Sequence, residues 1–160
     1  RFGYRFHNGF AGYRQDSLFP GQKRELDLFS LKEGTLARHR ITEGRNPSET
    51  VETVATFTGQ AFEIPAEASS LITLPDGYIV LLPDTAWKFG THVPVLQAKG
   101  FSQGAVRSFG QSRVAVFGEA AMFSSQLKGP DKIRFGFTAP EARDNQQFLL
   151  NIIQWLDDIL

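Results

Sequence analysis

One stretch of the chain decides the predicted fold: Arg113-Val114-Ala115-Val116-Phe117-Gly118-Glu119. Its apolar run from Val114 to Phe117 indicates a short buried strand, and Gly118-Glu119 then indicates a tight turn. Residues 120–127 follow with a composition that suits a short helix. Because a strand, a turn and a helix in this order form the repeating unit of α/β proteins, the stretch predicts an α/β fold.

The C-terminal residues predict an amphipathic helix that packs on the sheet. Thr138-Ala139-Pro140-Glu141 has the form of a capping box with a proline in the first turn. Asn145 and Gln146 fall in the first turns of this helix, and we expect both on its solvated face. Apolar residues recur after them at helical spacing, at Leu149, Ile152, Ile153, Leu156 and Leu160.

Turn signals divide the middle of the chain into strands. Ser70–Leu74 and Tyr78–Leu82 flank the turn sequence Pro75-Asp76-Gly77, which predicts a hairpin. Gly104–Phe109 and Arg113–Phe117 flank a second turn and predict another hairpin or two adjacent strands.

The composition fits a single soluble domain of 160 residues, a length that can bury a substantial core. Lys and Arg number 17 and so do Asp and Glu, so no net charge attracts nucleic acid or an anionic membrane. No apolar run approaches the roughly 20 residues that span a bilayer. The absence of cysteine excludes disulfides, thiolate metal sites and cysteine nucleophiles. We therefore expect neither a nucleic-acid nor a membrane partner, and the sequence does not distinguish the cytoplasm from the periplasm.

Three segments form a pattern along the chain: His39-Arg40-Ile41-Thr42-Glu43-Gly44, the strand region Arg113–Glu119, and Asn145–Leu156. Together they resemble the C-terminal half of glutamine-amidotransferase-like domains, in particular the uncharacterised bacterial branch and the trehalose-utilisation-like branch. Arg40 stands where the family pattern has proline, and Ser112 stands where it has glycine. The resemblance implies a flavodoxin-like, mostly parallel three-layer sheet with helices on both faces.

The start of the chain agrees with that expectation. Arg1-Phe2-Gly3-Tyr4-Arg5-Phe6 begins inside an aromatic-rich run without an initiating Met. We expect residues 1–160 to be the C-terminal portion of a larger domain, with the first strands in an N-terminal half of the same protein.

Glu119 is the first candidate for a functional residue, because ligands of open α/β sheets bind outside the carboxyl ends of strands. A carboxylate there can act as a general base, bind a sugar hydroxyl or hold a metal. The structural alternative is a negative charge at the N-terminus of the next helix. In the family that the chain resembles, this position carries a His-Pro-Glu segment whose histidine activates a cysteine. Phe117-Gly118-Glu119 has no such histidine, so amidotransferase catalysis by this chain alone is excluded.

Gly100-Phe101-Ser102-Gln103-Gly104 matches the G-x-S-x-G nucleophile elbow of esterases and lipases. The elbow needs a helix after the serine, whereas residues 105–109 alternate like a strand. Its triad also needs a later histidine, and the last histidine of the chain is His92. The sequence therefore argues against an esterase.

Two loop-like segments mix polar and aromatic side chains, which suits a sugar or another small polar ligand: His7-Asn8-Gly9-Phe10 and Asp84-Thr85-Ala86-Trp87. We take His7, Asn8 and Trp87 as ligand-binding candidates. Ordinary turn chemistry for Asn8 and a core position for Trp87 are the structural alternatives.

The remaining ligand-binding candidates are His39 and His92. No two histidines have a metal-ligand spacing, so the sequence indicates no metal site and no cofactor. Arg38 and Arg40 flank His39, and we expect their charge to lower its pKa and favour the neutral ring.

The leading functional prediction is a ligand-binding or accessory domain of glutamine-amidotransferase-like fold, for a carbohydrate or another small polar ligand. One alternative is a hydrolase whose site combines Glu119, and His39 or His7, with residues upstream of Arg1. Another is a protein-interaction domain, which needs an exposed apolar patch. The residues to inspect for that patch are Phe10, Tyr13, Phe19 and Phe29.

Overall fold

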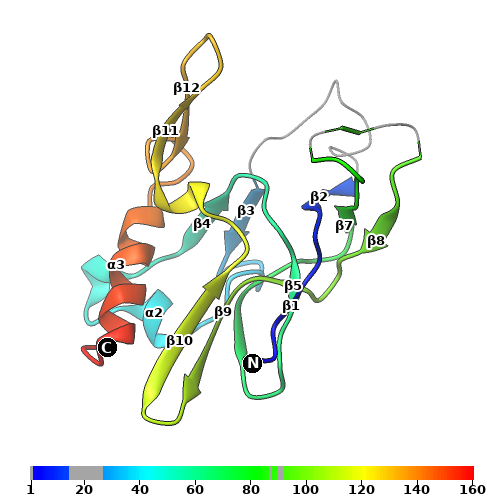
Figure 1. Cartoon of the computed structure of the whole chain (residues 1–160). Coiled ribbons are helices and arrows are strands. Elements are labelled where there is room, and N and C mark those ends of the chain that lie inside the picture. The colour runs from blue at the N-terminus through cyan, green and yellow to red at the C-terminus, as the bar shows by residue number, and fades with distance from the viewer. Residues whose placement is uncertain (1, 15–26, 87, 90–91) are drawn as a thin grey trace.

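The computed structural model describes residues 2–14, 27–86, 88–89 and 92–160, and it shows strands arranged in several small sheets (Figure 1). Among these residues strands account for 36% and helices for 16%, so the fold is mainly β. The described elements are, in order, β1 (Arg5–Phe6), β2 (Phe10–Tyr13), β3 (Asp27–Ser30), α2 (Arg40–Glu43), the 3₁₀ turn η2 (Pro47–Glu49), β4 (Thr53–Thr56), β5 (Phe62–Glu63), β6 (Ser69–Thr73), β7 (Tyr78–Leu81), β8 (Val95–Gln97), β9 (Ser102–Phe109), β10 (Ser112–Phe117), the 3₁₀ turn η3 (Ala121–Phe123), β11 (Ser125–Lys128), β12 (Ile133–Gly136) and α3 (Asn145–Leu156).

The central sheet is built around β9. Strand β10 pairs with one edge of β9, from Ser112 opposite Phe109 to Phe117 opposite Gly104. Strands β5 and β6 pair with the other edge, and β1 extends the sheet from β5. The first part of β9 is buried, so this strand forms the centre of the molecule.

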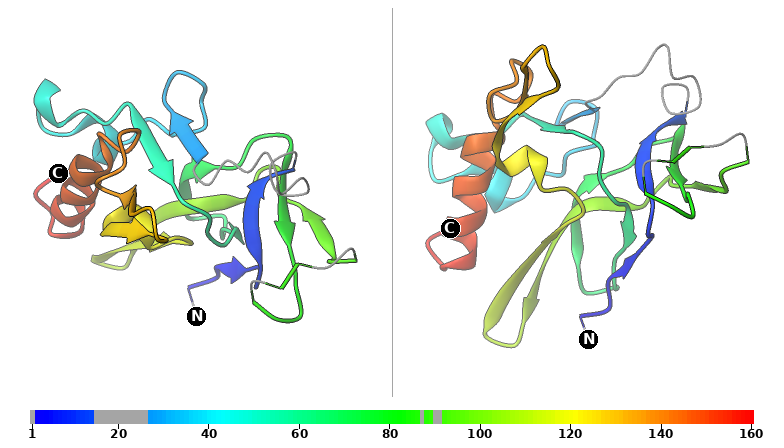
Figure 2. Two further views of the ribbon diagram at one scale, coloured as in Figure 1. Left: turned by 90° about the horizontal axis from the view of Figure 1, so that it is seen from above. Right: turned by 45° about the horizontal axis from the view of Figure 1, so that its top comes forward.

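Smaller sheets surround this centre. The sheet of β2, β7 and β8 and the helix α3 lie at opposite ends of the molecule in all three views (Figures 1 and 2). Strands β3 and β4 form a two-stranded ribbon beside α3, and the β11–β12 hairpin projects from the body. Helix α3 packs on β10, α2 and β4 through Phe148, Ile152 and Trp155, and each such side chain stabilises the fold by about 1.5–3 kcal/mol.

The predicted flavodoxin-like α/β fold is wrong. All strand pairs among the described residues are antiparallel, whereas a flavodoxin-like sheet is mostly parallel. The physical reason lies in the connections. Parallel neighbours need a crossover of a dozen or more residues, usually a helix, and the residues described between β4 and β10 contain no helix. The antiparallel pairing also contradicts the amidotransferase-like architecture that the resemblance implied.

The two predicted hairpins had different outcomes. The β9–β10 hairpin is confirmed. The strands on either side of Pro75-Asp76-Gly77 also form, but β6 pairs with β9 while β7 pairs with β2 and β8. The turn between them therefore passes the chain from one sheet to another. Residues 125–127, which were expected at the end of a short helix over residues 120–127, belong to β11 instead.

The C-terminal helix is confirmed, but it begins later than the capping box predicted. Thr138 donates its hydroxyl to the carbonyl oxygen of Phe135 at 3.0 Å, and the residues from there to Asp144 form turns. Asp144 directs its carboxylate away from its own helix and accepts from the backbone N–H groups of Glu52 and Thr53, at 3.0 and 3.1 Å. The helix start is thus set by a contact with the residues before β4.

Asn145 attaches α3 to two distant segments. Its Oδ1 accepts from the N–H of Ala55 at 2.9 Å, and its Nδ2 donates to the carbonyl oxygens of Ala55 and Met122 at 2.7 and 3.1 Å. The residue is completely buried, so the prediction that it lies on the solvated face is wrong. Gln146 is exposed as predicted.

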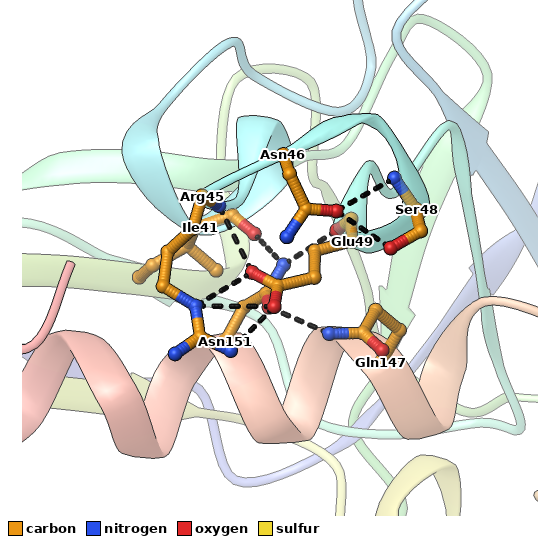
Figure 3. Close-up of polar contacts among 7 residues, drawn as sticks. All are labelled: Ile41, Arg45, Asn46, Ser48, Glu49, Gln147 and Asn151. Atoms are coloured by element: carbon orange, nitrogen blue, oxygen red, sulfur yellow. Dashed lines mark hydrogen bonds and ion pairs between the residues drawn. The ribbon is translucent and has the colours of Figure 1, made fainter.

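Asn151 attaches α3 to the α2–η2 segment (Figure 3). Its Nδ2 donates to the carbonyl oxygens of Ile41 and Glu49 at 2.7 and 2.8 Å, and its Oδ1 accepts from Gln147 at 2.8 Å. The guanidinium of Arg45 in turn donates to the Glu49 carboxylate, and these hydrogen bonds lower the pKa of Glu49 to about 2. Polar side chains on α3 therefore attach loops to the helix, in addition to the apolar contacts that attach the helix to the core.

No helix in the described part of the chain is long and apolar enough to cross a membrane.

Candidate functional site

A cleft of about 330 Å³ lies where four segments meet. Its lining comes from the residues before and at the start of β2, the turn after β4, the segment after β7 and the end of β10. These lining residues are Asn8, Gly9, Phe10, Thr58, Gly59, Gln60, Pro83, Asp84, Ala86 and Gly118. The two loop segments that the sequence analysis selected for ligand binding therefore share one cleft.

Three glycines allow these segments to approach closely. A Cβ on Gly9 would lie 2.3 Å from the carbonyl oxygen of Leu81, and one on Gly118 would lie 2.0 Å from that of Gln60. A Cβ on Gly59 would lie 2.6 Å from the Cβ of Glu119. Because real Cβ atoms do not come so close to backbone, any side chain at Gly9 or Gly118 would push the walls of the cleft apart.

Thr58, in the wall of the cleft, has a strained backbone. Its φ of 70° lies in the left-handed region, which a β-branched residue rarely adopts. Such a conformation costs about 1–3 kcal/mol and persists only where the surrounding structure enforces it. It sets the direction in which the chain leaves β4 toward Gly59 and Gln60.

Besides the Thr58 hydroxyl, the polar side chains of the cleft are those of Asn8, Gln60 and Asp84. Gln60 donates from Nε2 to Oδ1 of Asn8 at 3.5 Å, a long bond that leaves both amides able to bind a ligand. No hydrogen bond or ion pair to another described residue involves the Asp84 side chain, which is exposed. Phe10 adds an aromatic ring, in edge contact with Phe89 at 5.3 Å. The cleft thus offers two amides, a carboxylate and an aromatic surface.

Glu119 lies beneath this cleft rather than in it. Its side chain is buried, and its two carboxylate oxygens accept from the backbone N–H groups of Ala121 and Met122 at 2.5 and 2.8 Å. Burial raises the pKa of Glu119, although these amides favour the ionised form. Its position fits the structural alternative, a carboxylate that caps the turn η3 and supports Gly59.

His7 is part of a surface ion-pair group and does not line the cleft. Its Nε2 lies 3.0 Å from Oε1 of Glu63, which also binds Arg5 at 2.9 Å. The ring stacks on Phe101 at 4.7 Å with an interplanar angle of 9°. Both contacts tie β1 and β5 to the central sheet, so His7 has a packing role.

His39 caps helix α2. Its Nδ1 accepts from the N–H of Ile41 at 3.1 Å, and its ring meets the edge of Trp155. Burial lowers the pKa of His39, and Arg113 and Arg40 contribute to the decrease while Glu43 opposes it. The predicted direction is confirmed, but burial is the main cause and the second arginine is Arg113 rather than Arg38.

His92 is exposed and lines a second cleft, of about 390 Å³, beside Lys88. This cleft shares Pro83 and Asp84 with the first. Trp87 lies outside the described residues. No three His, Asp or Glu residues in the described part of the chain are grouped to hold a metal ion.

Ser102 is not a nucleophile. It is buried within β9, and its hydroxyl donates to the carbonyl oxygens of Ile72 and Gly104 at 3.1 and 2.7 Å. The strand that the alternation after Gly104 predicted is confirmed, and the nucleophile-elbow match is a coincidence of sequence.

Comparisons with known proteins add no further guide to the site. The chain matches no protein-family model, no curated protein and no solved structure. The geometry of the cleft therefore carries the functional argument.

Sequence reasoning selected Asn8 and the Asp84 loop but missed Thr58 and Gln60. The signal available for these two was Gly59, which interrupts a β-branched run after Phe57 and marks a close backbone approach.

Proposed function

We propose that this domain binds a small neutral polyhydroxylated ligand, of the carbohydrate class, in the cleft between Asn8 and Asp84. The observation that supports the proposal is that Asn8, Gln60, Asp84 and Phe10 line one cleft. Amides both donate to and accept from hydroxyl groups, and a carboxylate accepts from two adjacent hydroxyls. An aromatic ring packs against the apolar C–H face of a sugar.

The size of the cleft limits the ligand. At about 330 Å³ the cleft lies at the lower end of the range for small-molecule sites, roughly 300–1,000 Å³. It suits one sugar ring or a molecule of similar size. A longer saccharide would have to leave the cleft past Pro83 toward the second cleft.

The number and position of the carboxylates favour a binding function over glycoside hydrolysis. Glycoside hydrolysis ordinarily uses two carboxyl groups on either side of the scissile bond. Asp84 is the only carboxylate among the described lining residues, and the oxygens of Glu119 are already bound to backbone amides. The cleft has an acceptor for hydroxyls but lacks an acid–base pair.

The test is a binding screen of mono- and disaccharides against the purified chain by ligand-observed NMR, with calorimetry for any ligand found. Asp84→Ala should weaken binding by roughly 10- to 150-fold, because a hydrogen bond to a charged group contributes about 1.5–3 kcal/mol. Asp131→Ala is the matched control, since it removes an exposed carboxylate far along the chain in the β11–β12 hairpin. Gln60→Ala, with Gln111→Ala as its control, tests the amide wall in the same way.

Two results would overturn the proposal. One is a screen in which no saccharide binds at millimolar concentration. The other is a bound saccharide whose affinity is unchanged by both Asp84→Ala and Gln60→Ala, because that ligand must then bind elsewhere.

A further inference from the structure

The outward face of α3 is apolar, although the helix already buries its other face. Leu150, Ile153 and Leu156 expose 45%, 52% and 42% of their surfaces, and Leu149 beside them is half-buried. A helix at the surface of a globular protein normally has charged or polar residues on this side. Contiguous exposed apolar residues mark a protein contact.

The spacing on this face is that of a helix that packs against another helix. Gln146, Leu150 and Ile153 lie within α3 at intervals of four and three residues, and Arg143 and Asp157 continue this spacing in the turns that flank the helix. This repeat keeps a single line of side chains facing a partner helix. We call these five residues the α3 seam.

The two ends of the α3 seam carry opposite charges. Arg143 and Asp157 are exposed, and neither has an ion-pair partner among the described residues. In a second copy whose helix runs antiparallel, Asp157 would lie at the end that carries Arg143 of the first copy. Its Arg143 would lie at the end that carries Asp157 of the first copy. A parallel copy would instead place like charges together at each end.

We propose that the α3 seam binds a second copy of this chain, with the two α3 helices antiparallel about a two-fold axis. Leu150 faces Ile153 of the second copy, and Gln146 faces its Asp157. Arg143 lies in the turn before α3, three residues before Gln146, and so at the same end of the contact as that Asp157. Such a contact is self-complementary, as a two-fold interface must be, and the antiparallel helix dipoles also attract.

The contact is small, so the dimer should be weak. A stable interface covers about 800 Å² on each partner, which is more than one face of a 12-residue helix supplies. We expect a monomer–dimer equilibrium in the micromolar range, visible by sedimentation velocity from about 1 µM to about 1 mM.

The first test compares Ile153→Asp with Ile133→Asp in the full 160-residue chain. The two isoleucines are matched in exposure, at 52% and 54%, but Ile133 lies in the β11–β12 hairpin. Ile153→Asp should weaken the dimer at least about tenfold, because it places a charge in the apolar contact, while Ile133→Asp should not change it. A wild-type chain that stays monomeric at every concentration would overturn the proposal and leave the seam to a different partner. A dimer that survives Ile153→Asp would also overturn it.

The second test determines the orientation and does not depend on an apolar residue. Arg143→Glu and Asp157→Arg should each weaken the dimer, because each places like charges at both ends of the seam. The double variant, and an equimolar mixture of the two single variants, should restore it. If neither restores it, the antiparallel arrangement is wrong.

Discussion

Replacing Asn145 with alanine should have a large effect for a single polar residue. The change removes three hydrogen bonds that join α3 to Ala55 and Met122. At about 1 kcal/mol for each bond, the loss is roughly 3 kcal/mol, and the buried N–H of Ala55, left without that acceptor, brings it to about 3–5 kcal/mol. For a chain of this size, a loss of 3 kcal/mol lowers Tm by roughly 6–12 °C.

The assay is urea unfolding at equilibrium in a Trp87→Phe background, so that the fluorescence comes from Trp155, which lies on the buried face of the same helix. Gln146→Ala is the matched control, because it shortens the exposed neighbour and should change the free energy of unfolding by less than about 0.5 kcal/mol. A loss below about 1 kcal/mol for Asn145→Ala would refute the view that this residue holds the helix in place.

Asn145→Asp adds a pH-dependent arm to the same experiment. It sets a second oxygen, in place of Nδ2, against the carbonyl oxygens of Ala55 and Met122, so we expect burial and these carbonyls to raise the pKa of the new carboxyl group. With the folded-state pKa above the unfolded one, the variant should regain stability as the pH falls through its folded pKa. A defect that does not depend on pH would contradict this contact geometry.

Three further predictions concern single groups. Arg45→Ala should raise the pKa of Glu49 from about 2 toward its usual value. The lowered pKa stabilises the wild-type fold above the unfolded pKa of about 4.5, and this stabilisation is lost as the pH falls toward 2. The free energy of unfolding, measured across this pH range, should therefore depend less steeply on pH in the variant. Glu119→Gln should destabilise the fold by roughly 1–3 kcal/mol, since the amide nitrogen would face a backbone N–H. It should also remove the gain in stability that the raised pKa of Glu119 produces as the pH falls. Urea unfolding from neutral to acid pH measures both effects. Thr58→Gly should raise Tm, because relief of about 1–3 kcal/mol of backbone strain exceeds the roughly 0.5–1 kcal/mol entropic cost of glycine; an unchanged or lower Tm in calorimetry would mean that the turn is not strained.

The elements that sequence reasoning predicted correctly are those whose partner is near in the chain. The β9–β10 hairpin needs only a short turn, and α3 needs only its own apolar periodicity. The pairing of β6 with β9, across some thirty residues, depends on the whole fold and left no local sign. The fold class was wrong because residues 113–127 were interpreted as the strand, turn and helix of an α/β unit, whereas β10 is followed by the short 3₁₀ turn η3 and the strand β11.

The candidate site shows a similar division. Asn8 and the segment that contains Asp84 were selected because polar and aromatic residues cluster in loops, and loops commonly carry binding residues. Their meeting in one cleft, with Gln60 between them, follows from three sheets and was not readable from spacing. Glu119 was selected as a carboxylate that could act as a general base or bind a ligand, whereas its oxygens accept from the backbone N–H groups of Ala121 and Met122.

The cleft and the α3 seam are separate surfaces, since no seam residue lines the cleft, and the strands β2 and β7 beside the cleft lie at the end of the molecule opposite α3 (Figures 1 and 2). A two-fold contact through α3 would therefore leave both clefts uncovered. Two weak sites held in one dimer can bind a surface that displays many copies of a sugar more tightly than either site alone, through effective concentration. Ile153→Asp should then reduce binding to an immobilised saccharide while leaving the affinity for the free saccharide unchanged. An equal loss in both assays would instead mean that the seam acts on the cleft through the fold.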